Sequence, residues 1–253
     1  MKTIAIINLK GGVGKTITAI NMASILAKMD SRVLIIDNDK QGNTSKFFGV
    51  YDYEKKSIAD ILTEKNFDIE SAIYPTNYKN LEIIPANMKL LEANLKVIMD
   101  MSRQQQTILK KALKQIEDRY DYCIIDNAPD INISVINALV IANDVIVPIK
   151  IDQFAFDGLA QLTEQFAGLQ ELNPELKFKG CLVTQYANNL ANSGGVEFLR
   201  SQEQYPVFKT VIRRTVKVDE STFVGQPLLN YAPKSMAAKD YLNFVKEYLE
   251  QEE

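Results

Sequence analysis

The sequence predicts an α/β fold in which a doubly wound, mostly parallel β-sheet is flanked by helices, and it predicts one such domain over residues 1–253. Short runs rich in Ile and Val alternate along the chain with longer segments whose apolar residues recur at helical spacing. A glycine-rich stretch joins the first run to the first helical segment. Strict alternation of strand and helix is typical of a parallel sheet that is covered on both faces.

The individual elements follow from the same patterns. Apolar runs with β-branched residues predict strands, and apolar spacings of three and four residues predict helices. Lysines and glutamines interleave with apolar residues between positions 88 and 118, which favours two amphipathic helices there. The expected strands span residues 3–7, 32–36, 81–85, 120–126, 144–149, 178–184 and 210–212. The other expected helices span residues 16–29, 58–62, 131–142, 156–172 and 236–250, and a loop is expected over residues 226–235.

The glycine-rich stretch, residues 10–16, reads KGGVGKT and lies between the first expected strand and helix. Its three glycines allow backbone N–H groups to turn inward around an anion, and the helix start adds unpaired N–H groups and a positive dipole end. Lys15 would reach the β- and γ-phosphates of a nucleotide, and Thr16 would place its hydroxyl on magnesium. The expected nucleotide-binding residues are Gly11, Gly12, Val13, Gly14, Lys15, Thr16 and Ile17.

Carboxylates end two of the expected strands. Asp37 and Asp39 follow the strand at residues 32–36, and Asp126 ends the strand at residues 120–126. The carboxyl ends of parallel strands border the ligand crevice, so these side chains should lie beside the bound phosphates. Mg²⁺ prefers oxygen ligands and keeps part of its hydration shell. We therefore expect Asp37 and Asp126 to support magnesium with Thr16, and Asp39 to orient an attacking water.

Composition excludes several other classes of protein. Histidine is absent, which excludes a Ser-His-Asp hydrolase and a histidine-ligated zinc site. Cys123 and Cys181 lie inside expected strands, where buried thiols are the natural interpretation. Met1 and Lys2 lead directly into the first expected strand, so we expect neither a signal peptide nor an N-terminal DNA-binding domain. With no apolar run long enough to span a membrane, the expected compartment is the cytoplasm.

Charge is uneven along the chain. The formal net charge is −3, but residues 177–217 contain seven Lys and Arg against two Glu, a local excess of five positive charges. The last expected helix, in contrast, ends in the acidic residues 250–253, which read EQEE. A helix that docks on anionic lipid would carry basic residues beside its apolar face, so the acidic end argues against membrane anchoring.

Residues 10–16, 37–43 and 122–129 together resemble the deviant Walker A, switch-I-like and Walker B motifs of the ParA/MinD family of ATPases. Leu9 stands where the strict Walker A pattern has glycine, and Lys10 is the additional lysine of the deviant form. Residues 148–159 and 225–235 are similar to segments of the ParA/Soj branch. The resemblance implies an ATP- and Mg²⁺-dependent ATPase that forms a homodimer around two ATP molecules.

Residue roles follow from the same resemblance. Lys10 would reach the phosphates of the partner subunit, Lys15 would bind phosphate, Asp39 would position water, and Pro233 would lie near the adenine. Two departures from the family pattern stand out. Lys40 replaces the usual proline after the switch aspartate, and Asn127-Ala128-Pro129-Asp130 replaces a two-proline run. Neither departure removes a catalytic group.

The family resemblance implies partition of DNA. In the ATP-bound dimer such proteins bind nucleoid DNA without sequence preference, and a ParB-like centromere-binding protein stimulates hydrolysis. The expected DNA contacts come from the basic stretch and are Arg200, Arg213, Arg214 and Lys217. The alternative interpretation is that these residues form a basic face that contacts only solvent. A MinD-like positioning ATPase on membranes or protein cargo is the alternative, and the metabolic alternatives resemble nitrogenase iron protein or dethiobiotin synthetase.

Overall fold

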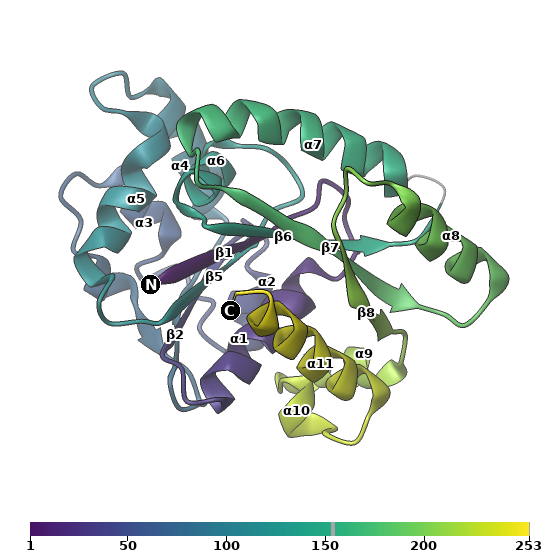
Figure 1. Ribbon diagram of the computed structural model, residues 1–253. Helices are drawn as coiled ribbons and strands as arrows, with labels where there is room; N and C mark the ends of the chain where they lie inside the picture. The colour runs from purple at the N-terminus through teal and green to yellow at the C-terminus, as the bar shows by residue number, and fades with distance from the viewer. Residues whose placement is uncertain (153–154, 253) are drawn as a thin grey trace.

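One eight-stranded sheet runs through the computed structural model, which describes residues 1–152 and 155–252 (Figure 1). The strand order is β3-β4-β2-β5-β1-β6-β7-β8, and all neighbouring pairs are parallel except β3 with β4. This arrangement confirms the expected doubly wound, mostly parallel sheet. The strands are β1 (Lys2–Ile6), β2 (Val33–Asn38), β3 (Tyr74–Pro75), β4 (Leu81–Ile84), β5 (Tyr122–Asn127), β6 (Asp144–Lys150), β7 (Lys177–Tyr186) and β8 (Val207–Arg213).

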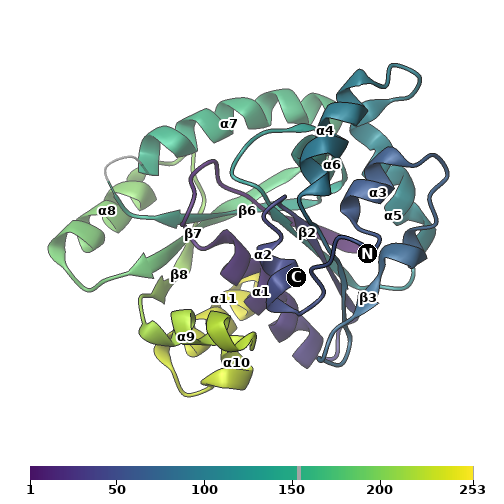
Figure 2. The same ribbon diagram turned by 180° about the vertical axis from the view of Figure 1, so that it is seen from behind.

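Helices cover both faces of the sheet, as Figures 1 and 2 show. Side chains alternate between the faces along each strand, so that Ile4 and Ile6 pack with one group of helices and Ala5 packs with the other. The first group contains α1 (Lys15–Lys28) and α11 (Met236–Glu250). The second group contains α3 (Ile58–Thr63), α4 (Lys89–Met99), α5 (Ile108–Leu113), α6 (Ile133–Ile141), α7 (Ala155–Leu172) and α8 (Leu190–Ser201).

Several short elements were not expected from the sequence. They are β3, α2 (Asn43–Phe47), α8, α9 (Val216–Val224), α10 (Leu228–Tyr231) and the 3-10 turns η1 (Ile69–Ala72), η2 (Gln105–Thr107) and η3 (Lys114–Ile116). Because α10 lies inside residues 226–235, the expectation of an uninterrupted loop there was wrong.

Helix α8 was missed because its sequence contains two adjacent glycines, which are poor helix formers. The structure supplies the reason for one of them. A Cβ atom on Gly195 would lie 2.2 Å from Cγ2 of Ile151, so only glycine allows the helix to approach the end of β6 this closely. Asn189 caps the helix by accepting a hydrogen bond from the Asn192 N–H at 2.9 Å.

Three further expectations can be compared with the fold. Cys123 and Cys181 are free and buried, as predicted. Among the described residues, no helix combines the length and the apolar character needed to cross a bilayer. Of the family-like segment at residues 148–159, Gln153 and Phe154 lie outside the described residues.

Candidate functional site

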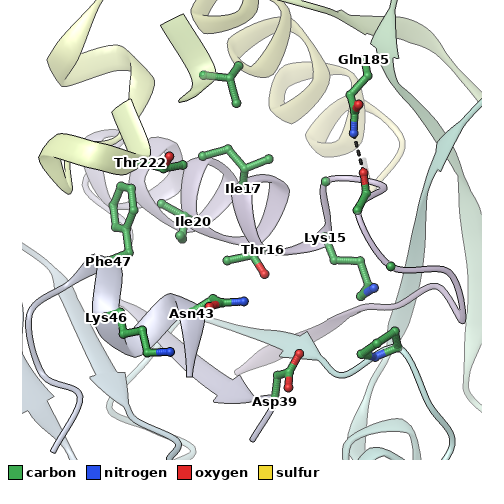
Figure 3. Close-up of a pocket in the computed structure, with 15 residues that line it drawn as sticks. Lys15, Thr16, Ile17, Ile20, Asp39, Asn43, Lys46, Phe47, Gln185 and Thr222 are labelled. Atoms are coloured by element: carbon green, nitrogen blue, oxygen red, sulfur yellow. Dashed lines mark hydrogen bonds between the residues drawn. The ribbon is translucent and has the colours of Figure 1, made fainter. Parts of the chain in front are cut away.

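The glycine-rich loop connects β1 to α1 at the carboxyl edge of the sheet, where Figure 3 shows it beside a cavity. Gly12 and Gly14 have φ angles of 72° and 86°, a left-handed backbone conformation that residues other than glycine rarely adopt. Val13 between them is buried, and its carbonyl oxygen accepts a 2.7 Å hydrogen bond from Thr184 Oγ1. The loop therefore has the curved backbone that the sequence predicted for binding an anion.

Lys15 begins α1 and lies inside this loop. Its side chain is buried, and its ammonium group donates a hydrogen bond of 3.0 Å to the carbonyl oxygen of Lys10. Burial lowers the pKa of Lys15, although the charge of the nearby Asp126 carboxylate opposes the shift. A partly desolvated ammonium group at the centre of the loop attracts phosphate more strongly than an exposed one would.

Asp37 and Asp126 are direct neighbours on β2 and β5, as their register shows. Desolvation raises the pKa of Asp37 to about 7, with the charge of Asp126 as the second cause, and desolvation raises the pKa of Asp126 to about 6. Both oxygens of Asp37 have donors, namely the backbone and hydroxyl of Ser45 at 2.8 and 2.6 Å and the Asp39 N–H at 3.2 Å. Asp37 thus anchors the start of α2.

Asp126 differs from Asp37 in one decisive respect. Its Oδ2 accepts a 2.8 Å hydrogen bond from Thr44 Oγ1, whereas its buried Oδ1 has no hydrogen-bond donor within the described part of the chain. A buried carboxylate oxygen without a donor is costly unless a cation or water satisfies it. Within that same part, no three acidic, Cys or His side chains form a cluster for a metal. Asp126 and Thr16 thus fit Mg²⁺ only if phosphate and water oxygens complete its coordination.

The cavity has a volume of about 660 Å³, which is in the range of small-molecule sites. Figure 3 shows a polar end near Lys15, Thr16, Asp39 and Asn43 and an apolar end near Ile17, Ile20 and Phe47. Such a division suits a ligand that joins phosphates to an aromatic base. The complete lining comprises Gly11, Gly12, Gly14, Lys15, Thr16, Ile17, Ile20, Asp39, Asn43, Lys46, Phe47, Pro129, Gln185, Val218 and Thr222.

Sequence reasoning missed about half of this lining. Asn43, Lys46 and Phe47 lie on the unexpected helix α2, and the segment after Asp39 was the signal that could have located them. Val218 and Thr222 come from α9, for which the sequence offered no signal. Pro233, expected near the adenine, is exposed between α10 and α11 and does not line the cavity.

Lys10 lies on the rim of the site. Its ammonium group forms an ion pair with Asp152 at 2.5 Å, and the two side chains are 33% and 31% exposed. The side chain of Lys15 is buried and that of Lys10 is partly exposed, so the two lysines of the loop occupy different environments. The sequence had no indication that Asp152, which follows β6, would hold Lys10.

The unusual Asn127 has a clear structural role. Its side-chain amide donates to the carbonyl oxygen of Ile6 at 3.2 Å, and its Oδ1 accepts from Asn38 Nδ2 at 2.8 Å. Asn127 therefore connects β5 to both neighbouring strands, β1 and β2, at the edge that carries the site. Nothing in the described part of the structure explains Lys40, the other departure from the family pattern.

The expected DNA-contacting residues do not form one uniform cationic surface. Arg213 makes a two-pronged ion pair with Asp240, with bonds of 2.9 and 2.6 Å, and Lys217 pairs with Glu220 at 2.7 Å. Arg200 and Arg214 are exposed, and the guanidinium of Arg200 donates to backbone carbonyls of β8. Partners from outside the basic stretch thus offset part of the local charge that its sequence suggested.

Comparisons with known proteins agree with this geometry. A family model described as "AAA domain" matches residues 1–178. The chain is 36% identical over 251 residues to the sporulation initiation inhibitor protein Soj of Bacillus subtilis, covering 97% of each chain. It is 33% identical to the chromosome partitioning protein ParA of Myxococcus xanthus, covering 99% of this chain and 89% of that one.

A solved structure with a closely similar fold carries a nucleotide. It is cobyrinic acid a,c-diamide synthase from Mycobacterium smegmatis with bound ADP and magnesium, which has a TM-score of 0.85 and 28% identity and covers 99% of this chain and 95% of that one. The chain shares 36% and 33% identity with Soj and ParA over nearly its full length. The two-lysine loop and the aspartates at the strand ends agree with a family relationship to both proteins. The chain belongs to the ParA/Soj branch of the ParA/MinD family of P-loop ATPases.

Proposed function

We propose that this protein is a DNA partition ATPase. ATP and Mg²⁺ close a homodimer, the dimer binds DNA without sequence preference, and a ParB-like partner stimulates hydrolysis and release. The protein would then act in the cytoplasm on nucleoid DNA. The observation that carries the proposal is the separation of the two loop lysines, with Lys15 buried in the loop and Lys10 held on its rim by Asp152.

Phosphate binding follows from the loop and Lys15. The left-handed glycines would turn N–H groups toward a bound phosphate, and the start of α1 would add its positive dipole end. Lys15 would exchange its hydrogen bond to the Lys10 carbonyl for a phosphate oxygen. Thr16 and Asp126 would hold Mg²⁺, with Asp37 beside Asp126 as the further predicted support, and the ion would neutralise charge on the β- and γ-phosphates.

Asp39 is the residue that we assign to the attacking water. One of its carboxylate oxygens accepts the Gln41 N–H at 2.9 Å, which fixes the side chain, and the group lines the polar end of the cavity. An oriented carboxylate can hold a water in line with the γ-phosphate and accept its proton as the bond forms.

Lys10 is the residue that we assign to dimerisation. Its ammonium group pairs with Asp152, and both side chains are about one third exposed. On dimerisation, Lys10 would exchange the Asp152 carboxylate for the phosphates of a partner subunit, so that one anionic partner replaces another. A lysine that arrives only on dimerisation would stabilise the charge that develops during phosphoryl transfer, which couples hydrolysis to assembly.

DNA contact is assigned chiefly to the exposed Arg214 and Arg200. Arg213 and Lys217, which we also predicted, would contribute less because carboxylates already compensate their charge. Binding that depends on a few phosphate contacts falls steeply with salt and is insensitive to sequence. A partition ATPase that moves over nucleoid DNA of any sequence requires these two properties.

The test measures binding to a random-sequence DNA duplex with ATP, with ADP and without nucleotide, at two salt concentrations. Wild type is compared with Lys10→Ala and with Lys28→Ala, which removes an exposed lysine from the far end of α1. We expect tight, salt-sensitive binding only with ATP, lost in Lys10→Ala and kept in Lys28→Ala. Absence of DNA binding under all conditions would refute partition and direct attention to membranes, protein cargo or metabolism.

A further inference from the structure

Gln185 is an exception among the residues with left-handed backbone. Four non-glycine residues in the described chain have positive φ, and the other three are Asp30, Asn66 and Asn80. Asn and Asp adopt this conformation at small cost, whereas a glutamine does so at a penalty. Gln185, with φ of 52°, also lines the nucleotide cavity. Backbone strain that persists beside a ligand site points to a functional constraint.

The strain has a structural origin in the pairing of β7 with β8. Between two paired positions, β7 advances three residues, from Val183 to Tyr186, while β8 advances two, from Val211 to Arg213. Gln185 therefore lies in a bulge of β7. Bulges redirect side chains that would otherwise alternate regularly across the sheet.

The bulge directs Gln185 onto the phosphate loop. Its amide nitrogen donates a 2.6 Å hydrogen bond to the carbonyl oxygen of Gly12, drawn as a dashed line in Figure 3. The preceding Thr184 donates at 2.7 Å to the carbonyl oxygen of Val13. Two consecutive residues of β7 thus hydrogen-bond to two consecutive carbonyl groups of the loop. The sequence separation is 171 residues for the bond from Thr184 and 173 residues for the bond from Gln185. Hydrogen bonds to both carbonyl groups fix the two peptide planes, and with them the orientation of the loop N–H groups that would face a phosphate.

The same bulge contacts the basic segment, which we define as residues 213–217 and which connects the end of β8 to the start of α9. The carbonyl oxygen of Tyr186 accepts a 2.9 Å hydrogen bond from the Arg214 N–H, and Tyr186 is paired in register with Arg213. Gln185 is consequently one residue away from the backbone that holds the proposed DNA-contacting arginine.

We propose that Gln185 is a positioning residue that holds the Gly12 carbonyl, and with it the phosphate-binding shape of the loop, and that the bulge carrying it connects the loop to the basic segment. This inference rests on the proposed nucleotide binding. Gln185 acts through the loop rather than on the reacting atoms, so its loss should weaken binding of ATP without slowing the chemical step.

The first test measures affinity for a non-hydrolysable ATP analogue with Mg²⁺ by calorimetry, together with KM and kcat for ATP. Gln185→Met keeps the length of the side chain but removes the donor, and Gln185→Gly removes the backbone strain as well. Gln115→Met, at an exposed glutamine of η3, is the control. We expect both Gln185 variants to bind about three- to tenfold more weakly, the range for one neutral hydrogen bond, with kcat unchanged.

Each other result would overturn the positioning role. Wild-type affinity in Gln185→Met would show that the hydrogen bond is dispensable, and wild-type affinity in Gln185→Gly would show that only the backbone turn matters. A fall in kcat at unchanged KM would make Gln185 a group that contacts the transition state. Thermal unfolding of each variant separates these effects from loss of folding.

The second test follows amide hydrogen exchange over residues 211–217, with and without saturating analogue. We expect nucleotide to slow exchange there in the wild type, and the effect to fall at least by half in Gln185→Met at saturation. No nucleotide effect in the wild type, or an equal effect in the variant, would refute the connection. Failure of the partition proposal is distinguishable, because it appears as wild-type protein that binds nucleotide but no DNA.

Discussion

Replacing Asp126 with asparagine should reduce the pH dependence of stability in the nucleotide-free protein and abolish ATP turnover. Asp126 is fully buried beside Asp37, and one of its carboxylate oxygens has no donor in the described chain. Ionisation of this group is therefore unfavourable in the folded protein, whereas in the unfolded chain water solvates the carboxylate. In the nucleotide-bound state that we propose, Mg²⁺ would compensate this charge.

The magnitude follows from the pKa values. Burial raises the pKa of Asp126 from 3.8 to about 6, and at 1.36 kcal/mol per pKa unit the difference corresponds to about 3 kcal/mol. The folded state binds the proton more tightly, so the stabilisation is fully present below about pH 4 and is lost as the pH rises through about 6. Asparagine cannot ionise. Between pH 4 and pH 8 the variant should therefore lose about 3 kcal/mol less stability than wild type. Asp37, whose pKa burial also raises, keeps part of the pH dependence in both proteins.

Urea unfolding followed by circular dichroism from pH 4 to pH 8, without nucleotide or Mg²⁺, measures this difference. Asp130→Asn is the matched control, because Asp130 is exposed on the loop that follows β5 and carries the same change of side chain. Parallel pH profiles for wild type and Asp126→Asn would refute the reasoning. Retained ATP turnover in Asp126→Asn would remove this carboxylate from the assigned magnesium site.

Three further predictions concern other parts of the molecule. Tyr248→Phe should lower the unfolding free energy by about 1–3 kcal/mol in urea titrations, because the hydroxyl donates at 2.6 Å to the fully buried Asp144, and an unchanged midpoint would contradict this. Arg214→Ala should reduce the slope of log affinity for DNA against log salt by about one without changing thermal stability, and an identical slope would exclude a phosphate contact. Cys123 and Cys181 should resist a thiol reagent until the protein unfolds, because burial raises the pKa of both thiols, and fast labelling of native protein would show that they are accessible.

Much of the fold could be predicted because its signals are local. The run before Lys10 and the helical spacing after Thr16 defined β1 and α1 within one residue at each boundary. A strand that is buried on both faces is apolar throughout, and a helix repeats its apolar residues at regular spacing. Each type of element can therefore be recognised from a short stretch of sequence. The missed elements are short or rich in glycine. In α8, the close approach of Gly195 to Ile151 is a tertiary requirement that opposes local helix propensity.

The same division holds for the site. The sequence by itself determined the phosphate loop and the strand-end aspartates, because loop curvature needs consecutive glycines and parallel strands bring their carboxyl ends together. Only the tertiary structure decided which carboxylate pairs with each basic side chain and which residues hydrogen-bond to the phosphate loop. Lys10 pairs with Asp152, which is 142 residues away in the sequence, and Gly12 accepts a hydrogen bond from Gln185, which is 173 residues away. Asp240 on α11 compensates the charge of Arg213. Such pairings depend on the order in which strands and helices pack, and no local pattern of residues contains that information.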